Sequence, residues 1–272
     1  MSEVPTEPAV SPVQQAPPVG EAARPAASGA RFHLHHVNTV QSLAGTVVIA
    51  VFVVTFIVQA FQIPSESMER TLLIGDYLLV DKAHYGQSHF WSWLLPYRPV
   101  HRQDIIVFRY PVNPQQHFVK RVIGVPGDRI RLINKHVYVN GVVQADAYAV
   151  FNWGQHDKFR DNFPDGGLFG DRVTSKWFLQ AQKLVEDGQL IVPEGYYFVL
   201  GDNRDDSYDS RYWGLVPAEN IVGRPLMIYW SMKRDDVPAD DDTQSGKLST
   251  LAYSIVQSFK GLRWDRMFRV PH

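Results

Sequence analysis

The chain has 272 residues, with 27 Lys and Arg against 28 Asp and Glu, and a formal net charge of -1. Proteins that bind nucleic acid usually carry a basic excess, so no nucleic-acid partner is expected. The sequence contains no cysteine, which excludes disulfides, thiolate metal sites and cysteine catalysis.

The N-terminal region combines a tail with a long apolar run. Residues 1–41 are expected to form a disordered tail, because their Pro- and Ala-rich start has no periodicity and can bury little apolar surface. Residues 42–61 are expected to form a single membrane-spanning helix, since no Asp, Glu, Lys or Arg occurs between Arg31 and Glu66.

A cleavable secretory signal ending at Ala60 is the alternative for this run. The tail before it is much longer than the usual start of such a signal, so a permanent anchor is favoured. Arg24 and Arg31 precede the run, whereas Glu66 and Glu69 follow it. Basic flanks stay in the cytoplasm, which predicts a single-pass plasma-membrane protein with its N-terminus inside and its main domain on the outer or periplasmic side.

Residues 62–232 are expected to form one mainly β domain with an antiparallel sheet. Short β-branched and aromatic runs separated by turn residues predict strands at residues 77–80, 105–108, 117–122, 137–139, 196–200 and 226–230. Asn140-Gly141 between valines predicts a tight hairpin. A smaller β-rich subdomain is expected to be inserted at about residues 135–193, with a short helix near residues 175–185.

Residues 233–272 are expected to be an acidic linker followed by a basic amphipathic tail. In residues 247–269 apolar side chains recur at helical spacing beside Lys and Arg, a pattern typical of segments that lie on anionic lipid. The aromatic run at residues 90–95 is a second candidate for membrane contact, since Trp favours the lipid interface. A packed loop is the alternative for that run.

Three segments carry candidate chemistry. Residues 63–68 read Ile-Pro-Ser-Glu-Ser-Met, residues 117–128 read His-Phe-Val-Lys-Arg-Val-Ile-Gly-Val-Pro-Gly-Asp, and residues 201–214 form a dense polar loop after an apolar strand. Taken alone, Ser67 would be a solvated turn or a helix cap, and Lys120 an edge-strand charge. Loops positioned by a scaffold nevertheless carry function more often than cores do.

Together the three segments resemble bacterial signal peptidase I, the leader peptidase family of serine/lysine dyad proteases, over about residues 61–232. The resemblance implies that Ser67 is the nucleophile and Lys120 the general base. It also implies that Ser65 donates to the oxyanion together with the Ser67 amide, and that Ser207 orients the lysine. Further residues are assigned by the same resemblance: Asp209 and Arg211 as a supporting ion pair, Arg121 with Asp202 as a second pair, and Phe61, Ile63, Met68, Leu72 and Val119 as substrate pockets.

The physical chemistry of the dyad is consistent with these roles. A serine hydroxyl is a weak nucleophile that needs an adjacent base. A lysine can act as that base only when neutral, and lowering its pKa of ~10.4 by about 2.5 pH units requires roughly 3.4 kcal/mol. Burial of Lys120 among Phe118, Val119 and Val122 can supply this energy by penalising the charged form.

The same resemblance implies substrates and partners. The expected activity is that of a membrane-bound endopeptidase that removes signal peptides with small residues at the first and third positions before the cut. Such substrates would bind as an added β-strand. The expected partners are preprotein signal peptides, membrane lipid and the protein export machinery; no cofactor and no metal are expected.

Two rival chemistries are disfavoured by position. The histidines of the outer region, none of which matches a motif position, are His84, His89, His101, His117, His136 and His156. In a strand, His117 would face the side opposite to Lys120. The aspartates of the 201–214 loop could bind a metal or form an acidic dyad, but such turns are more often solvated or paired with arginine.

Two rival functions are compatible with parts of this pattern, one with the fold and one with the dyad. A non-catalytic membrane-tethered peptide-binding protein would not need Ser67, Lys120 and Ser207 together. The self-cleaving repressors that use the same dyad are soluble and bind DNA, which the apolar run and the neutral charge disfavour.

Three residues depart from the family pattern. Glu66 replaces the usual glycine between the two serines, Arg70 stands where proline is common, and Gln103 where glycine is common. None is expected to touch a catalytic atom, but Glu66 places a charge beside the substrate path.

Overall fold

The structure is a computed structural model of the chain. It describes residues 28–85, 98–152, 154–164, 172–233 and 261–272, except for the side chains of residues 28–38, 55 and 56. Residues 1–49 and 50–272 form two separate compact units. The aromatic run at residues 90–95 and residues 247–260 of the amphipathic tail lie outside the described residues, so the membrane contacts expected there stay predictions.

Three elements cover the apolar run expected as one membrane helix, and the first of them begins at Ser28, within the tail that was expected to be disordered. Helix α1 (Ser28–Phe52) is followed by a π-helical turn (Val53–Ile57) and then by strand β1 (Val58–Gln62). The last four residues of the expected anchor, residues 58–61, therefore lie in a strand, because β1 hydrogen-bonds along its length to β2. Among the described residues, no helix has both the length and the hydropathy required to cross a bilayer.

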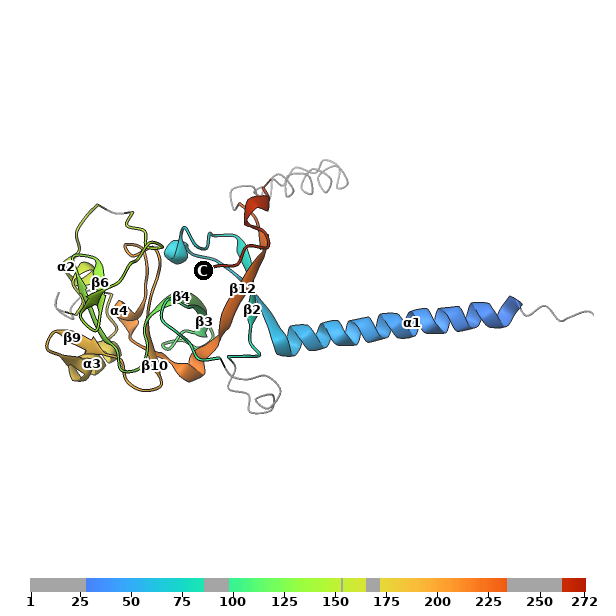
Figure 1. Cartoon of the computed structure of the whole chain (residues 1–272), viewed down its shortest axis with the longest axis horizontal. Coiled ribbons are helices and arrows are strands. Elements are labelled where there is room, and N and C mark those ends of the chain that lie inside the picture. The colour runs from blue at the N-terminus through green and yellow to red at the C-terminus, as the bar shows by residue number, and fades with distance from the viewer. Residues whose placement is uncertain (1–27, 86–97, 153, 165–171, 234–260) are drawn as a thin grey trace, which may run out of the picture. The chain divides into compact units, whose positions relative to one another are not determined.

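The larger sheet has seven strands, and all of its strand pairs are antiparallel, which confirms the expected mainly β class (Figure 1). Its spatial order is β1-β2-β12-β3-β4-β10-β11. The members after β1 are β2 (Asp76–Asp81), β3 (Ile105–Arg109), β4 (His117–Gly124), β10 (Tyr196–Leu200), β11 (Val216–Pro217) and β12 (Ile221–Ser231). The strands that carry the predicted catalytic segments are thus held in one hydrogen-bonded sheet.

Strand β3 separates two apolar cores. Its sequence Ile-Ile-Val-Phe is buried on both faces, which explains why it reads as a continuous apolar run instead of an alternating one. Ile106 and Phe108 face the large core shared with the second sheet, whereas Ile105 and Val107 face a smaller cluster. That smaller cluster supports the serine segment, as described below.

The second sheet contains five strands in the order β7-β6-β5-β9-β8 and is inserted in the chain between β4 and β10 (Figure 1). Its strands are β5 (Arg129–Ile133), β6 (His136–Val139), β7 (Val142–Val143), β8 (Val185–Glu186) and β9 (Gln189–Ile191), with helices α2 (Lys158–Asp161) and α3 (Ser175–Leu184) between β7 and β8. The insertion therefore begins with β5, before the expected boundary near residue 135, because β5 pairs with β6 and β9.

Local signals in the insertion are confirmed. Val139 pairs with Val142 across Asn140 and Gly141, which both have positive φ (52° and 80°), as a tight turn between twisted strands requires. Helix α3 begins where Thr174 accepts a hydrogen bond from the Trp177 amide, as a side-chain N-cap does.

Candidate active site

Ser67 lies on a short 3-10 turn (Glu66–Met68) that directly follows an extended segment after β1. Met68 on the same turn is buried in the smaller apolar cluster with Leu72, Leu78 and Ile228. This anchoring fixes the turn and leaves the Ser67 side chain at the surface of the cluster. Ser65, two residues earlier, places its Oγ 3.3 Å from the Ser67 Oγ.

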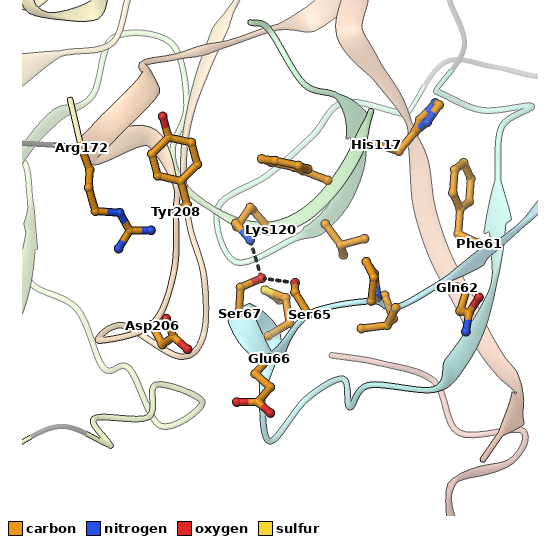
Figure 2. A pocket seen from close by; sticks show the side chains of 15 residues that line it. Phe61, Gln62, Ser65, Glu66, Ser67, His117, Lys120, Arg172, Asp206 and Tyr208 are labelled. Carbon is orange, nitrogen blue, oxygen red and sulfur yellow. Dashed lines mark hydrogen bonds between the residues drawn. The ribbon is translucent and has the colours of Figure 1, made fainter. Parts of the chain in front are cut away.

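Lys120 lies on β4, and its side chain reaches Ser67. The Lys120 Nζ is 2.5 Å from the Ser67 Oγ, and the dashed lines of Figure 2 connect both serines and the lysine. Lys120 is only 4% exposed. Burial lowers the pKa of Lys120 to about 8, and this effect outweighs the opposing attraction of Asp209 and Asp202. A substantial fraction of the amine is therefore neutral near pH 8.

The site lies where β10 and β4 separate. β10 pairs with β4 at Arg121, Val122 and Gly124, and this pairing does not extend to residues 117–120 of β4. The turn that carries Ser67 is tied to the loop after β10, since the Asn203 amide donates to the Ser67 carbonyl at 3.1 Å. Gly201 is required there, because a Cβ at this position would collide with the Ser207 Oγ and the Ser67 carbonyl.

Two buried ion pairs frame the lysine. Arg121 forms two hydrogen bonds with Asp202, at 2.8 and 2.6 Å, and Arg211 likewise forms two with Asp209, both at 2.8 Å. Burial alone would raise the pKa of Asp209, but the charge and hydrogen bonds of Arg211 outweigh it and hold that pKa below its usual value. Asp209 is also the N-cap of helix α4 (Ser210–Trp213), because its side chain accepts a hydrogen bond from the Arg211 amide. The same carboxylate therefore fixes the start of the helix and forms the ion pair.

Ser207 is buried beside the dyad, but the bond expected between its hydroxyl and Lys120 is not formed. Its Oγ makes no hydrogen bond of normal geometry to any described residue. The hydroxyl nevertheless contributes to the low pKa of Asp209. Ser207 therefore lies close to the supporting ion pair and the Gly201 backbone.

A cavity of about 340 Å³ opens over the dyad. Four of the five predicted pocket residues line it, namely Phe61, Ile63, Met68 and Val119. The fifth, Leu72, does not line this cavity; it is fully buried in the apolar cluster beneath it. Leu72 therefore supports the floor of the site from below.

Glu66, expected beside the substrate path, also lines the cavity. The lining residues that were not identified from the sequence are Gln62, Pro64, His117, Phe118, Arg172, Asp206 and Tyr208. The alternation of β4 could have identified Phe118, which shares a face with Lys120. Arg172 and Asp206 come from the insertion and from the loop after β10, and no local pattern links these two segments.

His117 lines the same cavity as Lys120, because the cavity is lined by residues from both faces of β4 at positions 117–120. Its ring lies beside Phe61, with centroids 5.1 Å apart, and Figure 2 shows it well away from Lys120. Burial and the nearby Arg109 lower the pKa of His117. Within the ranges that the structure describes, His, Asp and Glu side chains form no group of three that could hold a metal ion.

The family model for signal peptidase, peptidase S26, matches residues 36–230. Signal peptidase I of Aquifex aeolicus is 34% identical over 239 residues, which cover 75% of this chain and 88% of that protein. Signal peptidase I of Pseudomonas aeruginosa is 35% identical over 193 residues, covering 65% of this chain and 66% of that protein. A crystal structure of a signal peptidase I from Enterococcus faecalis, 34% identical, covers 47% of this chain and 97% of that one with a TM-score of 0.35.

The family-model match spans well over half of the chain, and the Aquifex relative exceeds 30% identity over three quarters of it. The chain therefore belongs to the signal peptidase family, peptidase S26, and is a serine-type peptidase.

Proposed function

We propose that this chain removes N-terminal signal peptides from exported preproteins, with Ser67 as nucleophile and Lys120 as general base. The observation that carries the proposal is the 2.5 Å contact between the Lys120 Nζ and the Ser67 Oγ, made by a buried amine with a pKa of about 8. The signal peptidase I proteins to which the chain is similar support the choice of substrate.

In the proposed mechanism, neutral Lys120 takes the proton from Ser67 as its Oγ attacks the carbonyl carbon of the scissile peptide bond. The resulting ammonium donates that proton to the leaving amine, which becomes the N-terminus of the mature protein. A water molecule then gives a proton to Lys120 and attacks the acyl-enzyme, and the proton returns to the Ser67 Oγ as the signal peptide leaves as a carboxylate. The buried Arg121–Asp202 and Arg211–Asp209 pairs are proposed to hold the loop and strand that place the amine.

The proposed substrate binds in extended form beside residues 117–120 of β4, beyond the point where β4 stops pairing with β10. The carbonyl before the cut would lie over Ser67, and side chains before the cut would point toward Phe61, Ile63, Met68 and Val119. The substrate residues before the cut would share one cavity of about 340 Å³, which favours small substrate side chains at these positions.

Cleavage of a preprotein by the purified protein tests this proposal. N-terminal sequencing of the product is expected to place the cut after a small residue. A matched preprotein with phenylalanine at the first and third positions before the cut is expected to remain intact. Equal processing of both substrates would contradict the proposed pockets.

The oxyanion is proposed to be stabilised by the Ser65 hydroxyl and the Ser67 amide. Ser65→Ala is expected to lower kcat by about 10²- to 10³-fold with little change in KM, because an oxyanion donor acts mainly on the transition state. Steady-state kinetics measure the effect. Ser175→Ala, which removes an exposed hydroxyl at the start of α3, is the matched control. An unchanged kcat in Ser65→Ala would mean that this hydroxyl does not face the oxyanion.

The pH dependence of kcat/KM is expected to rise through a pKa of about 8, because only neutral Lys120 accepts the serine proton. The sign follows from the lowered pKa of the amine: activity is lost as pH falls below 8, by about tenfold per pH unit, and is retained above it. A rise near ~6.5 that disappears in His117→Ala would instead assign the base to that histidine.

The protein is also proposed to be attached to the plasma membrane through the region that includes α1, with its N-terminus in the cytoplasm and the catalytic unit outside. The observation that supports attachment is the exposure of apolar side chains along α1, including Leu43, Val48 and Ile49, each at least 65% exposed. Membrane lipid and the export machinery are the proposed partners. Recovery of the full chain in the soluble fraction of lysed cells would contradict the attachment.

A further inference from the structure

The loop that follows β10 contains four aspartates, and one of them differs from the others. Asp202, Asp205 and Asp209 are buried, and each forms an ion pair with Arg or Lys. Asp206 is only half-buried and lines the cavity over the dyad. With the described residues it forms no ion pair, and its own amide bonds to the Asn203 side chain. Its carboxylate is therefore available to a bound ligand.

Asp206 lies on a defined side of the nucleophile. In Figure 2, Phe61, Gln62 and His117 lie on one side of Ser67, whereas Asp206, Tyr208 and Arg172 lie on the other. Glu66, beside the nucleophile, is exposed and also lines the cavity. This carboxylate likewise makes no ion pair within the described part of the chain.

Apart from the dyad lysine, one cationic side chain among the described residues that line this cavity opposes the two carboxylates. The Arg172 guanidinium lies over the rings of Tyr208 and Tyr212, at 5.4 and 5.1 Å from their centroids, and no ion pair with Asp206 is formed. Asp206, Glu66 and Arg172 together leave a net charge of -1 on this side of Ser67. The lowered pKa of His117 leaves that residue, at the other end, neutral near pH 8.

The positions of these charges bear on which substrates the enzyme prefers. This inference rests on the proposed function. If the residues before the cut occupy the side of Phe61, Ile63 and Val119, the chain after the cut must continue past Ser67 toward Asp206. We propose that Asp206, assisted by Glu66, is a specificity-determining residue that favours a basic side chain at the first or second position of the mature protein.

The expected size of this preference follows from the exposure of the groups. Ion pairs between partly exposed side chains are weak, so kcat/KM for a lysine peptide is expected to exceed that for a glutamate peptide by roughly threefold to tenfold. Screening by salt should reduce the ratio, since the carboxylates are open to solvent. A preference caused by side-chain shape would not change with salt.

The experiment uses the full chain in detergent and three peptides that differ only in having lysine, glutamine or glutamate at the first and second positions after the cut. The wild type is expected to rank them lysine, glutamine, glutamate at low salt. Asp206→Asn, which keeps the side-chain shape, should bring the lysine-to-glutamate ratio close to one, and Glu66→Gln should reduce it in part. Asp187→Asn is the matched control, because Asp187 is an exposed turn residue of the second sheet, and it should keep the wild-type ratio.

The outcomes separate the two proposals. Failure of the wild type to cleave the glutamine peptide at all would overturn the proposed function. Cleavage of all three peptides at equal rates, or a ratio that is unaffected by salt, would overturn the inference about Asp206 and leave the proposed function intact. If Asp206→Asn does not fold, the wild-type ratio, its salt dependence and Glu66→Gln still decide the matter.

Discussion

Ser67→Ala and Lys120→Ala are each expected to lower kcat/KM for a preprotein by at least about 10⁴-fold. The Ser67 Oγ and the Lys120 Nζ are in direct contact, so the loss of either removes the activated nucleophile. The double variant is expected to be no slower than either single variant, because residues that act as one unit are not additive.

Folding must be shown to survive these substitutions. Circular dichroism should give the wild-type spectrum for both variants, and the removal of a buried amine should not destabilise the core, since Lys120 makes no ion pair within the described residues. Lys183→Ala, at an exposed site on α3, should retain full activity as a matched loss of one lysine. Appreciable turnover by folded Ser67→Ala would show that another group attacks the substrate.

Arg211→Met is expected to reduce the free energy of unfolding by about 3 to 5 kcal/mol at neutral pH, because it leaves the Asp209 charge buried without its partner. Arg211 and Asp209 are 1% and 0% exposed in their side chains. Arg211 also donates to the backbone carbonyls of Arg204 and Arg160, so its loss loosens the loop that faces Lys120. Urea unfolding followed by tryptophan fluorescence measures the change.

The difference between wild type and Arg211→Met should depend on pH. In the wild type the pKa of Asp209 is lowered on folding, so the stability contributed by this group is present above its unfolded pKa of ~3.9 and is lost as pH falls further. The difference in free energy of unfolding between wild type and Arg211→Met should therefore become smaller at acidic pH. Arg129→Met is the control, since its pair with Glu186 is 41% and 61% exposed and should contribute less than ~1 kcal/mol. If Arg211→Met and Arg129→Met reduced the free energy of unfolding equally, burial would not be what makes the loss of the Arg211–Asp209 pair costly.

Elements whose signals are local could be predicted from the amino-acid sequence. The strands β2, β3 and β10 follow from β-branched and aromatic runs, the β6–β7 hairpin from Asn140-Gly141, and a short helix was expected near residues 175–185, where α3 lies. The candidate dyad was also identified from the sequence, because Ser67 and Lys120 lie in segments that match family motifs. For the strands, the hairpin and the helix the deciding information lies within a few neighbouring residues, whereas the dyad was identified only from three segments taken together.

The remaining features could not be predicted from local sequence, because they depend on contacts between residues far apart in the chain. An apolar run such as residues 58–61 fits a helix or a strand equally well, and pairing with β2 makes it β1. Arg129–Ile133 belongs to the inserted sheet because its partners are β6 and β9. Asp206 resembles its neighbours in sequence, yet Asp202 and Asp205 are paired with arginine and lysine side chains from distant segments, whereas Asp206 forms no ion pair with the described residues. Which carboxylate stays unpaired beside Ser67 is therefore set by packing.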